Sequence, residues 1–184
     1  MTGALLADVA PLWITSRASG IAALLCASLA IAAGLLMALK PAGLRMLRLE
    51  LRTAHESLAL ATFVLIVVHA ATLLLDPVLE PGVAGVLVPF AASYERVGTA
   101  LGQIAAYGML GLGLTFYLRR SIGSARWRRA HRLIPAFWAL AVLHGLLTGT
   151  DAGTWWFLAA VLPPVLAGAA LLVARHGRAE LARV

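Results

Sequence analysis

The chain has 184 residues, of which 61% are hydrophobic and 12% are charged. So much apolar surface excludes a soluble globular domain and indicates an integral membrane protein. The net charge of +7 does not indicate a nucleic-acid partner, because the basic residues lie in short segments between apolar stretches, where they orient the chain in the membrane.

Five apolar stretches are each long enough to cross a bilayer as a helix, for which about 20 residues suffice. Together they fill most of the chain, so we expect one domain and no separate soluble domain. The predicted fold is all-α, an integral membrane bundle of five transmembrane helices in contact with lipid. In chain order, the predicted spans cover about residues 12–39, 55–75, 97–118, 131–148 and 155–174.

Two kinds of segment interrupt this pattern. The connection 77–95 is the longest, and its middle, GVAGVLVPF, is too short and too rich in glycine to span. We expect it to lie in the outer interface or to fold back as a lid. Pro135 in the fourth span and the pair Pro163 and Pro164 in the fifth are expected to kink their helices, because proline removes a backbone donor and clashes with the preceding turn.

The charged residues between the spans are sorted by sign. The positive-inside rule places the basic segments in the cytoplasm, so the amino terminus is predicted outside and the carboxyl terminus inside, in the cell (inner or plasma) membrane. The acidic side holds Asp8, Asp76, Glu80, Glu95 and Asp151. The basic side holds Lys40, Arg45, Arg48 and Arg52, then Arg119, Arg120, Arg126, Arg128 and Arg129, and finally Arg175, Arg178 and Arg183.

Two segments, 52–76 and 128–151, share a pattern of histidines. Each reads Arg-x-Ala-His, followed by thirteen or twelve intervening residues, a second histidine, six residues and Asp. A histidine inside a membrane span is energetically unfavourable and marks a functional site by default. The four histidines are His55 and His69 in the first segment, and His131 and His144 in the second.

These histidines are predicted to pair by depth. Both segments run from inside to outside, so His55 lies level with His131, and His69 with His144. At about 1.5 Å of rise per residue, the histidines of each helix are about 20 Å apart, which leaves room for two porphyrins. Imidazole is a common axial ligand of heme iron, and two imidazoles leave no open position, which suits electron transfer. The pattern predicts a b-type cytochrome with bis-histidine hemes.

Helical phase supports only one of the two segments. Fourteen positions return His69 to within about 40° of the face of His55, whereas thirteen positions leave His131 and His144 about 140° apart on an ideal helix. A kink or bulge at Pro135 would repair the phase of the fourth span. With that repair two hemes are expected; without it, the fourth helix would ligate only one.

Two other interpretations of the histidines remain open. A zinc or copper site would need three or four close ligands, and no cysteine, carboxylate or third histidine is expected near either pair. In the second interpretation, the chain is a heme-free transporter or scaffold whose histidines serve helix packing. The colour of the purified protein separates these classes.

Arginines are the expected partners of the heme propionates, because guanidinium binds carboxylates in a bidentate manner. Arg17, near the outer end of the first span, is predicted to serve the outer heme, and its alternative role is to reach the lipid headgroups. Arg52 and either Arg129 or Arg132 are predicted to serve the inner heme. For these three, a plain positive-inside loop charge is the alternative.

Three stretches of the sequence resemble the ferric reductase-like transmembrane domain family. They are Leu-Trp-Ile-Thr-Ser-Arg-Ala-Ser-Gly at 12–20, Trp-Arg-Arg-Ala-His at 127–131 and His-Gly-Leu-Leu-Thr-Gly-Thr-Asp at 144–151. This superfamily includes ferric reductases, NADPH oxidases and the heme-binding membrane subunit of the bacterial periplasmic methionine sulfoxide reductase system. The resemblance implies two b-type hemes that carry electrons across the membrane. It places the inner heme on His55 and His131 and the outer heme on His69 and His144.

The sequence departs from the family's larger members after Ala174, where only ten residues remain. Ferric reductases and NADPH oxidases carry a cytoplasmic flavin- and nicotinamide-binding portion there. The departure favours an electron-transfer subunit of an oxidoreductase over a self-contained enzyme. Its donor would be a separate flavoprotein or quinol on the cytoplasmic side, and its acceptor an outward-facing protein or ferric iron.

Overall fold

A computed structural model describes residues 2–44 and 46–181, and within these ranges the chain is helical with no strand. Five of the described helical segments are long and apolar enough to cross a membrane, which fits a multi-pass membrane protein. Arg45 and Arg183, two of the predicted basic-side charges, lie outside the described residues. The helices are α1 (Thr2–Leu39), α2 (Arg48–Leu74), α3 (Gly82–Leu87), α4 (Arg96–Leu114), α5 (Arg119–Ile122), α6 (Ser124–His131), α7 (Ile134–Thr148) and α8 (Trp155–Leu181), with a 3-10 turn η1 (Ala42–Leu44) after α1.

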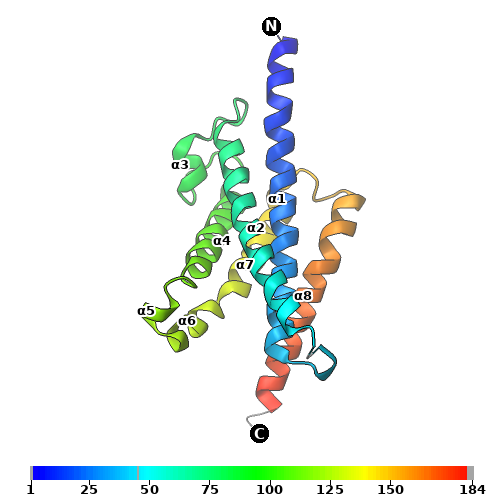
Figure 1. Ribbon diagram of the computed structural model, residues 1–184. Helices are drawn as coiled ribbons and strands as arrows, with labels where there is room; N and C mark the ends of the chain where they lie inside the picture. Colours follow the sequence, from blue (N-terminus) through cyan, green and yellow to red (C-terminus); the bar gives the residue numbers. More distant parts are fainter. Residues whose placement is uncertain (1, 45, 182–184) are drawn as a thin grey trace.

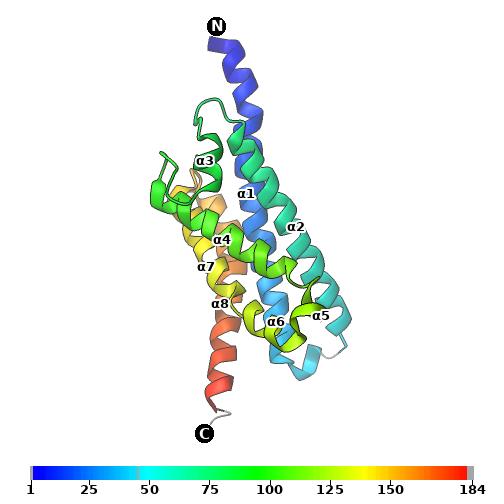
Figure 2. The same ribbon diagram turned by 90° about the vertical axis from the view of Figure 1, so that its left-hand side faces the viewer.

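Helix α1 lies at the centre of the bundle and contacts α2, α7 and α8, while α4 packs on α7 (Figures 1 and 2). Most of its buried residues are small, among them Ala23, Ala27, Ser28 and Ala30. Small side chains let helix backbones approach closely. Lipid tails are as apolar as the side chains, so helices in a membrane associate through such close van der Waals packing. The composition of α1 therefore explains its central place.

The charged loops are sorted along the bundle. In Figure 1 the α1–α2 loop and helices α5 and α6 lie toward the end where α8 finishes, and α3 lies toward the opposite end. Arg178 on α8 donates to the carbonyl of Leu39, which ties the end of α8 to the end of α1. The basic segments therefore share the carboxyl-terminal end of the bundle, and the acidic connections share the amino-terminal end.

The predicted fourth span is two helices rather than one. Helix α6 ends at His131 and α7 begins at Ile134, with Pro135 in the first turn of α7. Proline is favourable in a first turn, where its missing N–H would have no intrahelical acceptor. In an uninterrupted helix its ring would clash with the carbonyl four residues earlier, that of His131. The interruption lies at residues 132–133, between His131 and His144, where a shift of helical phase was expected.

Several other helices extend beyond the predicted spans, and α1 begins at Thr2 instead of residue 12. Helix α2 begins at Arg48 instead of residue 55, and α4 ends at Leu114, with turns up to residue 118. Helix α8 runs without interruption from Trp155 to Leu181, so Pro163 and Pro164 do not end it.

The long connection 77–95 folds back against α4 and forms α3. Gln103 on α4 donates its Nε2 hydrogens to the carbonyls of Gly85 and Val86, at 2.7 and 2.9 Å, and the hydroxyl of Tyr107 donates to that of Leu87. The last carbonyls of a helix have no intrahelical partner, and apolar surroundings make an unpaired carbonyl costly. Gln103 and Tyr107, one turn apart, therefore hold the end of α3 in place.

A buried hydrogen bond joins α1 to α7. The indole Nε1 of Trp138 donates to Ser28 Oγ at 3.0 Å, and Ser28 Oγ donates to the carbonyl of Leu24 at 2.7 Å. Both side chains are almost fully buried. The pair fixes the contact between the central helix and the helix that carries His144.

Replacement of Ser28 by alanine is expected to lower the free energy of unfolding by about 1–3 kcal/mol, because it leaves a buried indole N–H without an acceptor. Thermal unfolding in detergent micelles measures the effect. The matched control is Ser57→Ala, since Ser57 is exposed on α2. Equal melting temperatures for the two variants would contradict the structural role of the bond.

Candidate functional site

The four histidines form two pairs between α2 and the α6–α7 segment. The ring centroids of His55 and His131 are 6.3 Å apart, with an interplanar angle of 80°. Those of His69 and His144 are 6.4 Å apart, with an angle of 74°. The partners in each pair are those predicted from depth, and the break before Pro135 lets the α6–α7 segment contribute to both.

The spacing within each pair equals that of two rings facing one metal atom. An imidazole nitrogen lies about 2.0–2.1 Å from a bound transition metal. The atoms of a five-membered ring with bonds near 1.35 Å lie about 1.1 Å from its centroid. Two rings on opposite sides of one metal atom therefore have centroids about 6.3 Å apart. Both measured distances agree with this value.

Three of the four rings donate Nδ1–H to a backbone carbonyl. His55 donates to Ala30, His69 to Ser16 and His144 to Gly98, at 2.8, 2.8 and 2.9 Å. A carbonyl only accepts, so Nδ1 carries the proton and Nε2 keeps its lone pair. Metal-bound histidines make this second bond as a rule, since it orients the ring and raises its basicity. The three rings are therefore set in the tautomer that ligates through Nε2.

A glycine follows each of these carbonyls by four positions. A Cβ at Gly20 would lie 3.0 Å from Nδ1 of His69, and one at Gly102 only 2.6 Å from Nδ1 of His144. A Cβ at Gly34 would lie 3.2 Å from Cε1 of His55. In a helix the Cβ of a residue leans back over the preceding turn, so only glycine leaves the carbonyl four positions earlier open to a ring. We call Gly20, Gly34 and Gly102 the cradle glycines.

The sequence carries a signal for two of the cradle glycines, Gly20 and Gly34. Gly20 and Gly34 are fourteen positions apart in the first span, as are His55 and His69 in the second. Because the two helices are adjacent and antiparallel, equal spacing lets Gly20 lie beside His69 while Gly34 lies beside His55. Glycines at the histidine interval on the neighbouring span are therefore a recognisable pattern.

His131 differs from the other three histidines. Its Nδ1 is buried and has no hydrogen-bond partner among the described residues. Its ring instead stacks on Trp127, with centroids 5.0 Å apart and an interplanar angle of 28°. Trp127 is thus in direct contact with a candidate ligand.

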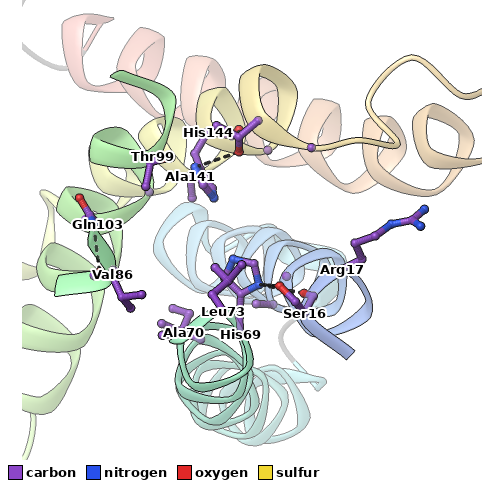
Figure 3. Close-up of a pocket in the computed structure, with 18 of the residues that line it drawn as sticks. Ser16, Arg17, His69, Ala70, Leu73, Val86, Thr99, Gln103, Ala141 and His144 are labelled. Atoms are coloured by element: carbon purple, nitrogen blue, oxygen red, sulfur yellow. Dashed lines mark hydrogen bonds between the residues drawn. The ribbon is translucent and has the colours of Figure 1, made fainter. Parts of the chain in front are cut away.

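A large apolar cavity of about 900 Å³ contains the His69–His144 pair. It is bounded by α1, α2, α4, α7 and the folded-back α3 segment, and Figure 3 shows His69 and His144 facing the space from different helices. Cofactor sites commonly have about 300–1,000 Å³, with mostly apolar linings and few polar groups. The size, the lining and the paired rings fit a flat cofactor such as a porphyrin.

The pocket at the His55–His131 pair is much smaller, about 60 Å³. Ile31, Phe63 and Met109 line it, and the Phe63 ring lies against Gly113, where a Cβ would be only 2.3 Å away. A porphyrin at this pair therefore requires these side chains to move. The two pairs have the same spacing but differ in the room around them.

In the described part of the chain, none of the four predicted arginines forms a hydrogen bond with a histidine ring. Arg17 borders the large cavity, but its guanidinium extends away from the histidines (Figure 3) and forms a bidentate pair with Asp151, with Nε to Oδ2 at 2.7 Å. Arg52 pairs with Glu56 at 2.9 Å on the exposed face of α2. Arg129 and Arg132 are exposed. Their role toward propionates stays a prediction.

The acidic residues have structural partners of their own. Asp76 is buried and accepts from the backbone N–H groups of Val78 and Leu79, at 2.8 and 3.0 Å, which shapes the turn into the α3 segment.

Across the described residues, no three His, Cys, Asp or Glu side chains come close enough together to hold a metal ion. Each histidine pair thus offers two ligands.

Comparison of the chain with protein-family models, with curated proteins and with solved structures finds no match.

Proposed function

We propose that this protein is a membrane b-type cytochrome that passes electrons across the bilayer as a subunit of a reductase. The observation that carries the proposal is the pair of histidine contacts, 6.3 and 6.4 Å between centroids, each matching two imidazoles on one metal atom. A bound heme would supply a one-electron iron couple, while the protein supplies ligation, spacing and surroundings.

Each group of residues has a distinct part in this proposal. His69 and His144 would hold the outer heme, and His55 and His131 the inner one. The carbonyls bound to Nδ1 keep three of the rings oriented and raise their basicity. The mostly apolar walls of the large cavity would surround the outer heme. Two imidazoles leave no position for a substrate on the metal, so the site transfers electrons rather than binding oxygen.

The direction of transfer follows from the charged loops. The basic end of the bundle is proposed to face the cytoplasm, by the positive-inside rule. His55 and His69 are fourteen residues apart on α2, which is about 21 Å along the helix and most of a bilayer core of about 30 Å. Electrons would enter at the His55–His131 pair from a flavoprotein or quinol. They would leave at the His69–His144 pair toward an outward protein or ferric iron.

The resemblance to the ferric reductase-like transmembrane domain family supports the same proposal, since the matching stretches include His131, His144 and the Trp127 that stacks on His131. The opening stretch at 12–20 includes Ser16, the acceptor for His69, and Gly20, its cradle glycine. The quoted motifs thus coincide with contacts around the two pairs.

The alternative is a heme-free transporter or scaffold in which the histidines join helices. The three Nδ1–carbonyl bonds favour it, because they link α1 to α2 and α4 to α7 without any metal. Against it, no hydrogen bond of the described residues uses Nε2 of these rings. Packing alone would leave those nitrogens without a partner in the described part of the protein.

Heme per chain in the purified protein, measured as pyridine hemochrome against protein concentration, tests the proposal. We expect about two hemes per chain after expression with ample heme supply. A value near one would restrict the function to the His69–His144 cavity. A colourless protein would end the cytochrome proposal and leave the heme-free alternative.

A further inference from the structure

Six arginines lie between the apolar helices α4 and α7, and we call them the arginine surface. Two belong to α5, three belong to α6, and one follows α6 directly. The sequence around them supplies no counter-charge, since no Asp or Glu occurs between Glu95 and Asp151. The six are Arg119, Arg120, Arg126, Arg128, Arg129 and Arg132.

The fold does not neutralise this charge either. In the described ranges, 2–44 and 46–181, the ion pairs join Arg17 to Asp151 and Arg52 to Glu56, so none of them includes the arginine surface. All of its side chains except that of Arg119 are exposed. Like charges close together repel one another, so an anion bound from outside the chain would stabilise them.

Aromatic contacts hold the arginine surface on one compact unit. The ring of Trp127 on α6 meets that of Phe116 edge to face, with centroids 5.7 Å apart, and the guanidinium of Arg119 lies 3.7 Å from the centroid of the Phe116 ring. Helices α5 and α6 contact each other, and α6 contacts α4, at the carboxyl-terminal end of the bundle (Figures 1 and 2). The arginines therefore extend from packed helices rather than from an irregular loop.

Exposed apolar side chains lie among the arginines. Four of them are each more than a third exposed, namely Tyr117, Leu118, Ile122 and Leu133. The segment also joins two apolar helices, because α4 ends at Leu114 and α7 begins at Ile134. Basic and apolar residues mixed at the end of a span suit a membrane surface, where the basic side chains reach headgroups and the apolar ones reach acyl chains. A lipid accounts for both kinds of side chain, whereas an acidic protein accounts only for the charge.

We propose that the arginine surface binds the phosphate groups of anionic phospholipids in the adjacent membrane leaflet. A guanidinium forms two parallel, charge-assisted hydrogen bonds with phosphate oxygens, which gives it both strength and geometric fit for such a headgroup. Clusters of about four to eight Lys or Arg residues next to a membrane span are typical of sites for anionic lipids. The inference goes beyond the proposed function, because none of these contacts requires a heme.

The experiment measures lipid binding to the full-length protein in uncharged detergent micelles by native mass spectrometry. The wild type should bind phosphatidylglycerol in preference to zwitterionic phosphatidylcholine. The triple variant Arg126→Gln, Arg128→Gln, Arg129→Gln should bind phosphatidylglycerol about 100-fold more weakly, because each basic residue near a membrane surface contributes about five-fold. The three side chains are exposed, so their replacement should leave the protein folded.

The matched control is the triple variant Lys40→Gln, Arg48→Gln, Arg175→Gln. It removes the same charge from the α1–α2 connection and the last turns of α8, outside the arginine surface. This variant should keep the selectivity of the wild type. Equal losses in the two triple variants would overturn the proposal, because the total charge of that end of the bundle would then hold the lipid. Equal binding of the two lipids by the wild type would overturn it as well.

Two competitors identify the source of the bound anion. Neither inorganic phosphate nor polyglutamate, at the concentration of the lipid, should displace phosphatidylglycerol. Displacement by phosphate would assign the surface to a free anion, displacement by polyglutamate would assign it to an acidic protein, and either result overturns the proposal. If the triple variant does not accumulate, Arg126→Gln alone should still bind the lipid about five-fold more weakly. A colourless wild type that binds phosphatidylglycerol selectively overturns the proposed function and leaves this inference intact.

Discussion

Replacement of His69 by alanine is expected to remove the outer heme and lower the heme content from about two to about one per chain. The same loss is expected for His144→Ala, because a single imidazole would remain in the cavity. His55 and His131 form a pair of their own, and His55 lies about 21 Å from His69 along α2, so neither substitutes for a missing outer ligand. Pyridine hemochrome of the purified variants measures the content, and the low-spin spectrum of the remaining heme shows that the inner site persists.

Two further variants sharpen this prediction. His55→Ala should remove the inner heme and spare the outer one. His176→Ala is the matched control, because His176 is exposed near the end of α8 and bonds only to the carbonyl of Leu172 one turn earlier. A His69→Ala or His144→Ala protein that keeps its full heme content would show that the pairing is wrong.

Replacement of Gly102 by alanine is expected to weaken heme binding at the outer site about 10- to 100-fold, the usual effect of removing a contact that orients a metal ligand. The new Cβ would lie 2.6 Å from Nδ1 and 2.7 Å from Cγ of His144, closer than non-bonded atoms approach. The ring would have to move off Gly98, whose carbonyl it binds at 2.9 Å. Titration of the heme-depleted protein with hemin measures the change.

Gly111→Ala is the matched control on the same helix, because a Cβ there meets no atom within 4 Å. Alanine is also favoured over glycine in a helix by about 0.5–1 kcal/mol, so this variant should be as stable as the wild type or more so. Gly20→Ala should have a smaller effect than Gly102→Ala, because its Cβ would lie 3.0 Å from the His69 ring. Equal heme affinity for Gly102→Ala and Gly111→Ala would show that the cradle glycine at position 102 does not position His144.

The side chains around the histidines could not be predicted from the sequence alone. Arg17 was expected to face a propionate, but the sequence does not reveal that Asp151, more than a hundred residues later, reaches its guanidinium. Gln103 and Tyr107 show the same limit, since their acceptors belong to a connection with no regular pattern. Contacts between distant segments depend on how the helices pack, and the identity of a single residue does not predict which segment it will meet.

The sequence by itself determined the five apolar segments and which histidines share a level. Both follow from one-dimensional constraints, because a bilayer sets the length of a span and helical rise sets the depth of a residue. The tertiary structure decided the direction of each ring. In the structure the fourth span is broken before Pro135. Glycines on α1 and α4 lie against three of the rings, and the ring of His131 stacks on Trp127. Orientation depends on side chains from other helices, and only packing brings these into contact.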